Sequence, residues 1–132
     1  MAMVSCGYLN RPGRHLDTLT ALHNLATIVE RLGRYTDAEP LYLKAIERKR
    51  RVLGDEHPST CNSLARLASM CMKQHRYRES ESNALAAYRG YVARLGEDHE
   101  TTQKVAQQLV ALYAATGRPA EAEQWRAKLR NK

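Results

Sequence analysis

The stretch LGDEHPST at residues 53–60 returns 42 residues later as LGEDHETT at residues 95–102. The same interval separates three sets of identical residues, namely His15, His57 and His99, then Leu25, Leu67 and Leu109, then Arg34, Arg76 and Arg118. A fixed period without gaps is typical of repeat proteins, in which each repeat folds as one supersecondary unit. The period predicts repeats at about residues 15–56, 57–98 and 99–132, preceded by a tail at residues 1–14. A chain of 132 residues has the usual length of one domain, so we expect residues 15–132 to form a single domain.

Apolar residues recur within each repeat at helical spacing, and no strand-like alternation appears. In the first repeat, one helix would have an inward face that consists of Leu22, Leu25, Ala26, Val29 and Leu32. A glycine at residue 33 would end that helix, because glycine adopts the left-handed conformation that often follows a helix. The same pattern along the chain predicts six helices, at about residues 16–32, 36–53, 58–74, 78–95, 100–116 and 119–130.

Small residues at matching positions of the repeats would let these helices approach each other closely. They are Ala26, Ala38, Ala68, Ser80 and Ala122. Because such a repeat cannot bury its faces alone, about three repeats are needed for stability. The fold class we predict is all-α, a stack of three helix–turn–helix repeats that curves into a superhelix with a concave face. Arg126 and Arg130 replace apolar residues at the end of the third repeat, which suggests a polar end.

The repeat resembles the tetratricopeptide repeat (TPR) over about residues 15–130. Its pattern of large and small positions is matched by Leu22, Leu25-Ala26, Gly33-Arg34-Tyr35, Ala38, Tyr42 and Ala45-Ile46. The 42-residue period and the joint at residues 53–60 are similar to the kinesin light chain type, whose helices are longer than those of the standard repeat. The resemblance implies a right-handed superhelix that works as a non-catalytic scaffold for protein binding.

By this resemblance, the first helix of each repeat lines the concave groove. The residues expected there are Thr20, His23, Asn24, Thr27, Glu30 and Arg31, then Asn62, Arg66, Ser69 and Lys73, then Lys104, Gln107, Gln108 and Ala111. Amide side chains can hydrogen-bond a peptide backbone, and arginine can hold a carboxylate through two parallel bonds. With a net charge of +7, the hypothesis is a groove for an acidic or C-terminal peptide segment of another protein.

The sequence contains no motif that supports catalysis, cofactor binding or metal binding. The periodic histidines stand at repeat joints, where capping or packing is the expected role, and no phosphate loop or nucleophile motif is present. Cys61 and Cys71 would lie about 15 Å apart on one helix, too far for a disulfide, which favours a reduced, cytoplasmic setting. No apolar run approaches the roughly 20 residues of a membrane span. The basic run at residues 48–51 is interpreted as the exposed side of a helix.

Two other functions remain open. The apolar end faces of a short stack could pair into a homodimer. The net charge of +7 could also attract nucleic acid, although the chain lacks an aromatic platform or a groove-reading motif. We therefore expect nucleic acid to be the less suitable partner.

Overall fold

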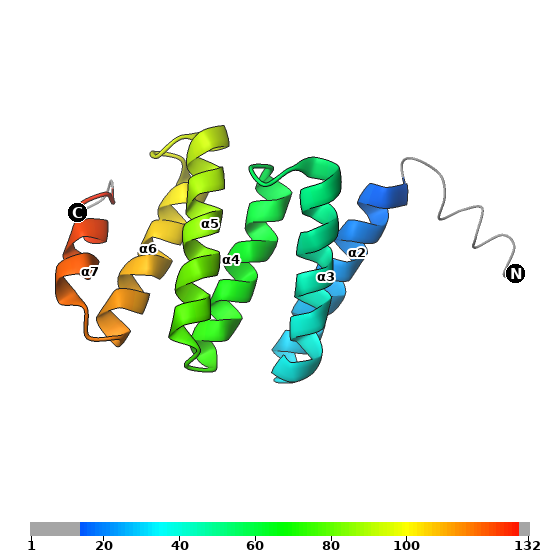
Figure 1. Ribbon diagram of the computed structural model, residues 1–132, viewed down its shortest axis with the longest axis horizontal. Helices are drawn as coiled ribbons and strands as arrows, with labels where there is room; N and C mark the ends of the chain where they lie inside the picture. The colour runs from blue at the N-terminus through cyan, green and yellow to red at the C-terminus, as the bar shows by residue number, and fades with distance from the viewer. Residues whose placement is uncertain (1–13, 130–132) are drawn as a thin grey trace, which may run out of the picture. The chain divides into compact units, whose positions relative to one another are not determined.

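The computed structural model describes the backbone of residues 14–129 and the side chains of residues 19–129. All six predicted helices are present in this part of the chain, and the fold is all-α (Figure 1). They are α2 (Arg14–Arg31), α3 (Tyr35–Leu53), α4 (Pro58–Lys73), α5 (Tyr77–Leu95), α6 (Glu100–Ala115) and α7 (Pro119–Arg126). The helices fall into two compact units, residues 1–52 and 53–132, so the single domain expected from the sequence stays a prediction.

The last helix is shorter than predicted, since α7 ends at Arg126 and not near residue 130. Beyond it, the amide of Lys128 donates to the Trp125 carbonyl at 3.0 Å, and the amide of Leu129 donates to the Arg126 carbonyl at 3.1 Å. Bonds that reach back three residues tighten the chain into a turn and do not continue the α-helix. The other helix ends agree with the prediction to within two residues.

Histidines cap two of the helices that begin a repeat. The Nδ1 atom of His57 accepts from the Ser59 amide at 3.0 Å, and that of His99 accepts from the Thr101 amide at 3.1 Å. Both bonds satisfy an amide that has no partner inside its helix. The predicted capping role is thus confirmed for these two residues, whereas the side chain of His15 lies outside the described residues.

The first unit contains α2 and α3, which share a buried polar cluster. The Tyr42 hydroxyl donates to Glu30 Oε1 at 2.6 Å and lies 3.2 Å from the Thr27 hydroxyl. The His23 ring meets the Tyr42 ring edge-on, with centroids 5.8 Å apart. Glu30 was expected on the exposed groove side, and that prediction is wrong because this carboxylate is buried as the acceptor for Tyr42.

Two expectations about α3 and α2 also need correction. Lys49 belongs to the basic run at residues 48–51 but is buried, because it shares a helical face with Tyr42 and Ala45. Burial lowers the pKa of Lys49 to about 8. In α2, Leu25 and Leu32 were predicted to point inward but are exposed, since they lie on a different side of the helix from the buried Ala26.

The second unit contains α4, α5, α6 and α7, each in contact with the next along the chain (Figure 1). Its core consists mainly of leucine, alanine and tyrosine side chains, among them Leu67, Leu109 and Tyr113. Ser80 occupies a small-residue position as predicted, and its hydroxyl donates to the Ala68 carbonyl at 2.7 Å. This bond joins α5 to α4 where an alanine would offer only contact.

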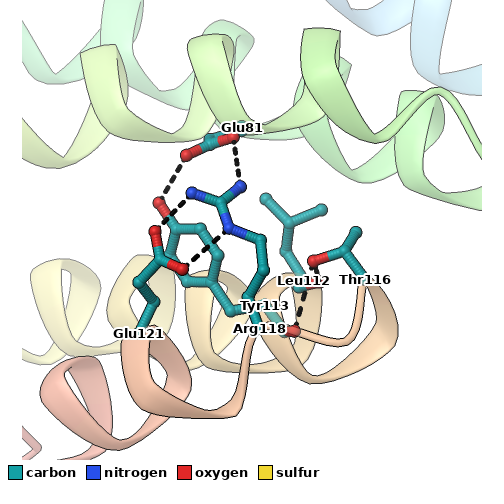
Figure 2. Close-up of polar contacts among 6 residues, drawn as sticks. All are labelled: Glu81, Leu112, Tyr113, Thr116, Arg118 and Glu121. Carbon is teal, nitrogen blue, oxygen red and sulfur yellow. Dashed lines mark hydrogen bonds and ion pairs between the residues drawn. The ribbon is translucent and has the colours of Figure 1, made fainter.

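A polar clamp joins α5 to the turn between α6 and α7 (Figure 2). Glu81 on α5 accepts from the Tyr113 hydroxyl at 2.7 Å and from Arg118 at 3.0 Å. Arg118 also pairs with Glu121 and lies over the Tyr113 ring, with its guanidinium carbon 4.7 Å from the ring centroid. Because one arginine and one tyrosine reach across to Glu81, the clamp fixes α6 relative to α5.

We expect Glu81→Gln to lower the free energy of unfolding at pH 7 by about 1–2 kcal/mol, since it weakens two hydrogen bonds to a charged acceptor. Burial by itself raises the pKa of Glu81, but hydrogen bonds from Tyr113 and Arg118 outweigh it, so the pKa lies below its usual value. Such a carboxylate stabilises the fold above its unfolded pKa, and that stabilisation is lost as the pH falls through its folded pKa. The free energies of unfolding of wild type and Glu81→Gln, measured with urea, should therefore differ at pH 7 and become equal well below about pH 4.

Glu123→Gln is the matched control, because residue 123 stands one repeat after residue 81. Its carboxylate pairs with Arg126 on the surface, and exposed pairs contribute little. An unchanged gap between wild type and Glu81→Gln at pH 3 would contradict the assignment.

Candidate peptide-binding surface

The first helices of the second and third repeats, α4 and α6, contact each other within the second unit. Eight of the predicted groove residues lie on these two helices. The four on α4 follow each other at steps of four, three and four residues, and on α6 both Gln107 and Gln108 lie three or four residues from Lys104 and from Ala111, so each set lies along one side of its helix. We call these eight residues the α4–α6 surface: Asn62, Arg66, Ser69 and Lys73 on α4, and Lys104, Gln107, Gln108 and Ala111 on α6.

Most of this surface is open to solvent, as the prediction requires. The exposed members are Asn62, Lys73, Lys104, Gln107 and Ala111, and the half-buried members are Arg66, Ser69 and Gln108. The Nε2 group of Gln108 donates to the Ala65 carbonyl at 3.1 Å. This amide nitrogen therefore acts within the protein, where it fastens α6 to α4.

The charge of the α4–α6 surface is entirely positive. Arg66, Lys73 and Lys104 contribute three cations, and none of the eight residues is acidic. Helix α4 contains no Asp or Glu, and the only acidic residue of α6 is Glu100 in its first turn. The acidic residues of the neighbouring α5 and α7 instead include the arginine-paired Glu79, Glu81, Glu121 and Glu123.

Apart from the buried Glu30, the other five predicted residues on α2, in the first unit, are Thr20, His23, Asn24, Thr27 and Arg31. Thr20, Asn24 and Arg31 are exposed, whereas His23 and Thr27 are half-buried. His23 and Thr27 both contact Tyr42. The Thr27 hydroxyl also donates a hydrogen bond to the His23 carbonyl at 3.0 Å. These contacts show that His23 and Thr27 help to join α2 to α3.

The described residues were also compared with what a reactive cysteine, a metal site and a membrane-spanning helix require. Cys61 and Cys71 are free and buried, and desolvation raises the pKa of the Cys61 thiol to about 11, which makes it a poor nucleophile. Between residues 14 and 129, no three side chains of His, Cys, Asp or Glu are placed to share a metal ion. None of the helices described here has the length and apolarity that crossing a bilayer requires.

Residues 17–91 match the family model for the tetratricopeptide repeat, which is more than half of the chain. The chain belongs to the tetratricopeptide repeat family. This fold generally mediates protein–protein interaction and is typically a non-catalytic scaffold. No curated protein matches the chain in sequence.

Solved TPR structures confirm the kinesin light chain-like form of the repeat. BtubC (BKLC) from P. vanneervenii aligns with a TM-score of 0.76 and 18% identity over 85% of this chain and 45% of its own. A Podosopora anserina protein, described as a kinesin light chain with nearly identical TPR-like repeats, aligns with a TM-score of 0.75 and 23% identity over 87% of this chain. The alignment covers 53% of that protein. The TPR chain thus spans about half the length of these structures, and at such identities the likeness concerns the fold.

Proposed function

We propose that this TPR chain is a non-catalytic interaction module that binds an acidic peptide segment of another protein on the α4–α6 surface. The observation that carries the proposal is the placement of Arg66, Lys73 and Lys104 on two adjoining first helices without an acidic residue among them. Such a surface attracts carboxylates and repels basic segments.

Each residue type on this surface suits one part of an extended peptide. Arg66 can hold a carboxylate by two parallel hydrogen bonds, while Lys73 and Lys104 act as point charges. The amides of Asn62 and Gln107 can pair with peptide backbone groups. Ala111 is small, which leaves room for a bulky side chain.

Helix geometry sets the spacing of acidic residues in the ligand. Arg66 and Lys73 are seven residues apart, which is about 10 Å along α4. An extended peptide advances about 3.3–3.6 Å per residue, so one carboxylate for each cation requires acidic residues about three positions apart. The Gln108–Ala65 bond and the Glu81 clamp hold α4, α5 and α6 in place, and such preorganisation lowers the cost of binding.

Selection from a displayed library of random short peptides, at about 0.15 M salt, tests the proposal. We expect the recovered peptides to be rich in Asp and Glu, with pairs about three positions apart. Their affinity should fall as salt rises, because exposed charges are screened. Recovery of neutral or basic peptides, or of none, would contradict the proposal.

Charge reversal locates the binding surface. Arg66→Glu together with Lys73→Glu should weaken binding of a recovered acidic peptide by roughly a hundredfold or more, measured by fluorescence anisotropy. Lys44→Glu together with Arg48→Glu is the matched control, because it changes the net charge equally through two exposed residues of α3. Equal losses in both variants would show that net charge, and not the α4–α6 surface, controls binding.

A further inference from the structure

Helix α3 carries a row of exposed cations in the second half of its length. Lys44, Arg48 and Arg51 are exposed and follow each other at steps of four and three residues, so they lie on one side of the helix over about 10 Å. Arg50 is a fourth exposed cation beside them. The one exposed carboxylate between residues 44 and 51 is that of Glu47, whose surface pair with Arg51 at 3.3 Å contributes little. We call Lys44, Arg48 and Arg51 the α3 row.

The repeat fold does not account for these charges. In the second repeat the matching positions of α5 are Ala86, Gly90 and Ala93, so the same helix forms without a cation at any of them. The dipole of a helix favours cations only in its last turn, and Lys44 and Arg48 precede the last turn of α3. A role outside the fold is therefore the better explanation for the row.

Two exposed apolar side chains border the α3 row. Leu43 directly precedes the row and Val52 directly follows it, and each side chain is 50% exposed. Because each residue turns about 100° around a helix, these two residues lie at opposite edges of the row. Cations beside exposed apolar residues are typical of a helix that lies on a membrane, where the apolar side chains insert at the level of the headgroups.

Other anionic partners suit this side of α3 less well. The helix contains neither Asn nor Gln, so it lacks the amides with which Asn62 and Gln107 can pair with a peptide backbone. Single-stranded nucleic acid is usually held by exposed aromatic side chains on which its bases stack. The aromatic residues of α3 are Tyr42, which is buried, and Tyr35, which is half-buried at the far end of the helix. An anionic bilayer requires neither amides nor aromatic residues.

We propose that the α3 row binds the surface of an anionic lipid membrane, with Lys44, Arg48 and Arg51 on the lipid phosphates and Leu43 and Val52 inserted between the headgroups. Arginine can hold a phosphate through two parallel hydrogen bonds, and lysine acts as a point charge. Four exposed cations within residues 44–51 reach the number at which a helical cluster binds anionic lipid. The row lies on α3 and not on the α4–α6 surface, so this proposal does not depend on peptide binding.

Co-sedimentation of the full chain with lipid vesicles tests the proposal. Vesicles of phosphatidylcholine with about 30% phosphatidylserine should bind half of the protein at about 1 mM lipid in about 0.1 M salt, and more weakly as salt rises. Vesicles of pure phosphatidylcholine should bind roughly tenfold less protein, because they carry no net charge. Equal binding to both kinds of vesicle, or no binding to the anionic ones, would overturn the proposal.

Charge reversal locates the contact with the vesicle. Lys44→Glu together with Arg48→Glu should weaken binding to the anionic vesicles by roughly a hundredfold. Arg66→Glu together with Lys73→Glu is the matched control, since it changes the net charge equally on α4 and should weaken vesicle binding by less than about threefold. Equal losses in the two variants, or a larger loss in the control, would overturn the proposal. Peptide binding should show the opposite pattern, so that failure of one proposal can be told from failure of the other.

A third variant separates a membrane from other anions. Leu43→Ser together with Val52→Ser keeps the net charge and should weaken vesicle binding by roughly tenfold, because it removes the inserted apolar groups. Circular dichroism should show the helix content of wild type in all three variants. Vesicle binding that these serines left unchanged would overturn the proposal. So would tighter binding to a single-stranded RNA than to the vesicles, since the row would then be a nucleic-acid site.

Discussion

Leu109→Ala is expected to lower the free energy of unfolding by about 3–5 kcal/mol, the largest effect of any substitution considered. Leu109 is fully buried in α6 among side chains of the second unit. Truncation removes its apolar contacts and leaves a cavity that the close-packed helices can fill only in part. Urea unfolding followed by circular dichroism would measure the loss.

The repeat itself supplies the control for this substitution. Leu25 is the same residue type at the same repeat position, but it is about half exposed on α2. Leu25→Ala should therefore cost less than about 1 kcal/mol. Equal losses at both positions would contradict the burial that the structure assigns to them.

Gly90→Ala is expected to lower the free energy of unfolding by about 2–3 kcal/mol, although alanine has a higher helix propensity than glycine. Alanine in a helix interior gains about 1 kcal/mol over glycine, so an exposed site would become more stable. At Gly90, however, a Cβ would lie 2.3 Å from Cys61 Sγ, 3.2 Å from the Asp55 carbonyl oxygen and 3.3 Å from Glu56 Cα. Glycine is thus needed where α5 crosses the start of α4.

A second substitution separates the two causes of this clash. Cys61→Ala removes the sulfur but leaves the backbone of residues 55 and 56 in place. The double variant Gly90→Ala with Cys61→Ala should therefore be less destabilised than the sum of the single variants. A Gly90→Ala protein more stable than wild type would show that α4 and α5 do not approach so closely.

Much of the fold follows from the period, because the period places the same helix pair three times. The small residues Ala26, Ala38, Ser80 and Ala122 are buried as predicted. Periodicity identifies the apolar positions of a helix but cannot tell which of two apolar faces has a neighbour. Leu25 was therefore assigned to the core with the same reasoning that correctly placed Ala26.

The candidate site was predictable as far as helical spacing determines exposure. Asn62, Lys73, Lys104 and Gln107 are exposed on their helices as expected. The bond from Gln108 to Ala65 joins residues 43 positions apart, and no local pattern predicts it.

Glu30 was misplaced for a similar reason. Its burial depends on Tyr42 twelve residues away, a partner that helix periodicity within α2 does not include. The prediction that the basic run at residues 48–51 is exposed was wrong for Lys49. Its charge suggested exposure to solvent, but its position on the inward face of α3 buries it.

Amide chemical-shift mapping by two-dimensional NMR, with a library-selected acidic peptide added to the labelled protein, tests the central claim most directly. We predict that the largest shifts fall on α4 and α6, near Arg66, Lys73 and Lys104, and that α5 and α7 change little. Large shifts confined to α5 and α7, or shifts spread evenly over the basic residues of the chain, would contradict an acidic-peptide site on the α4–α6 surface.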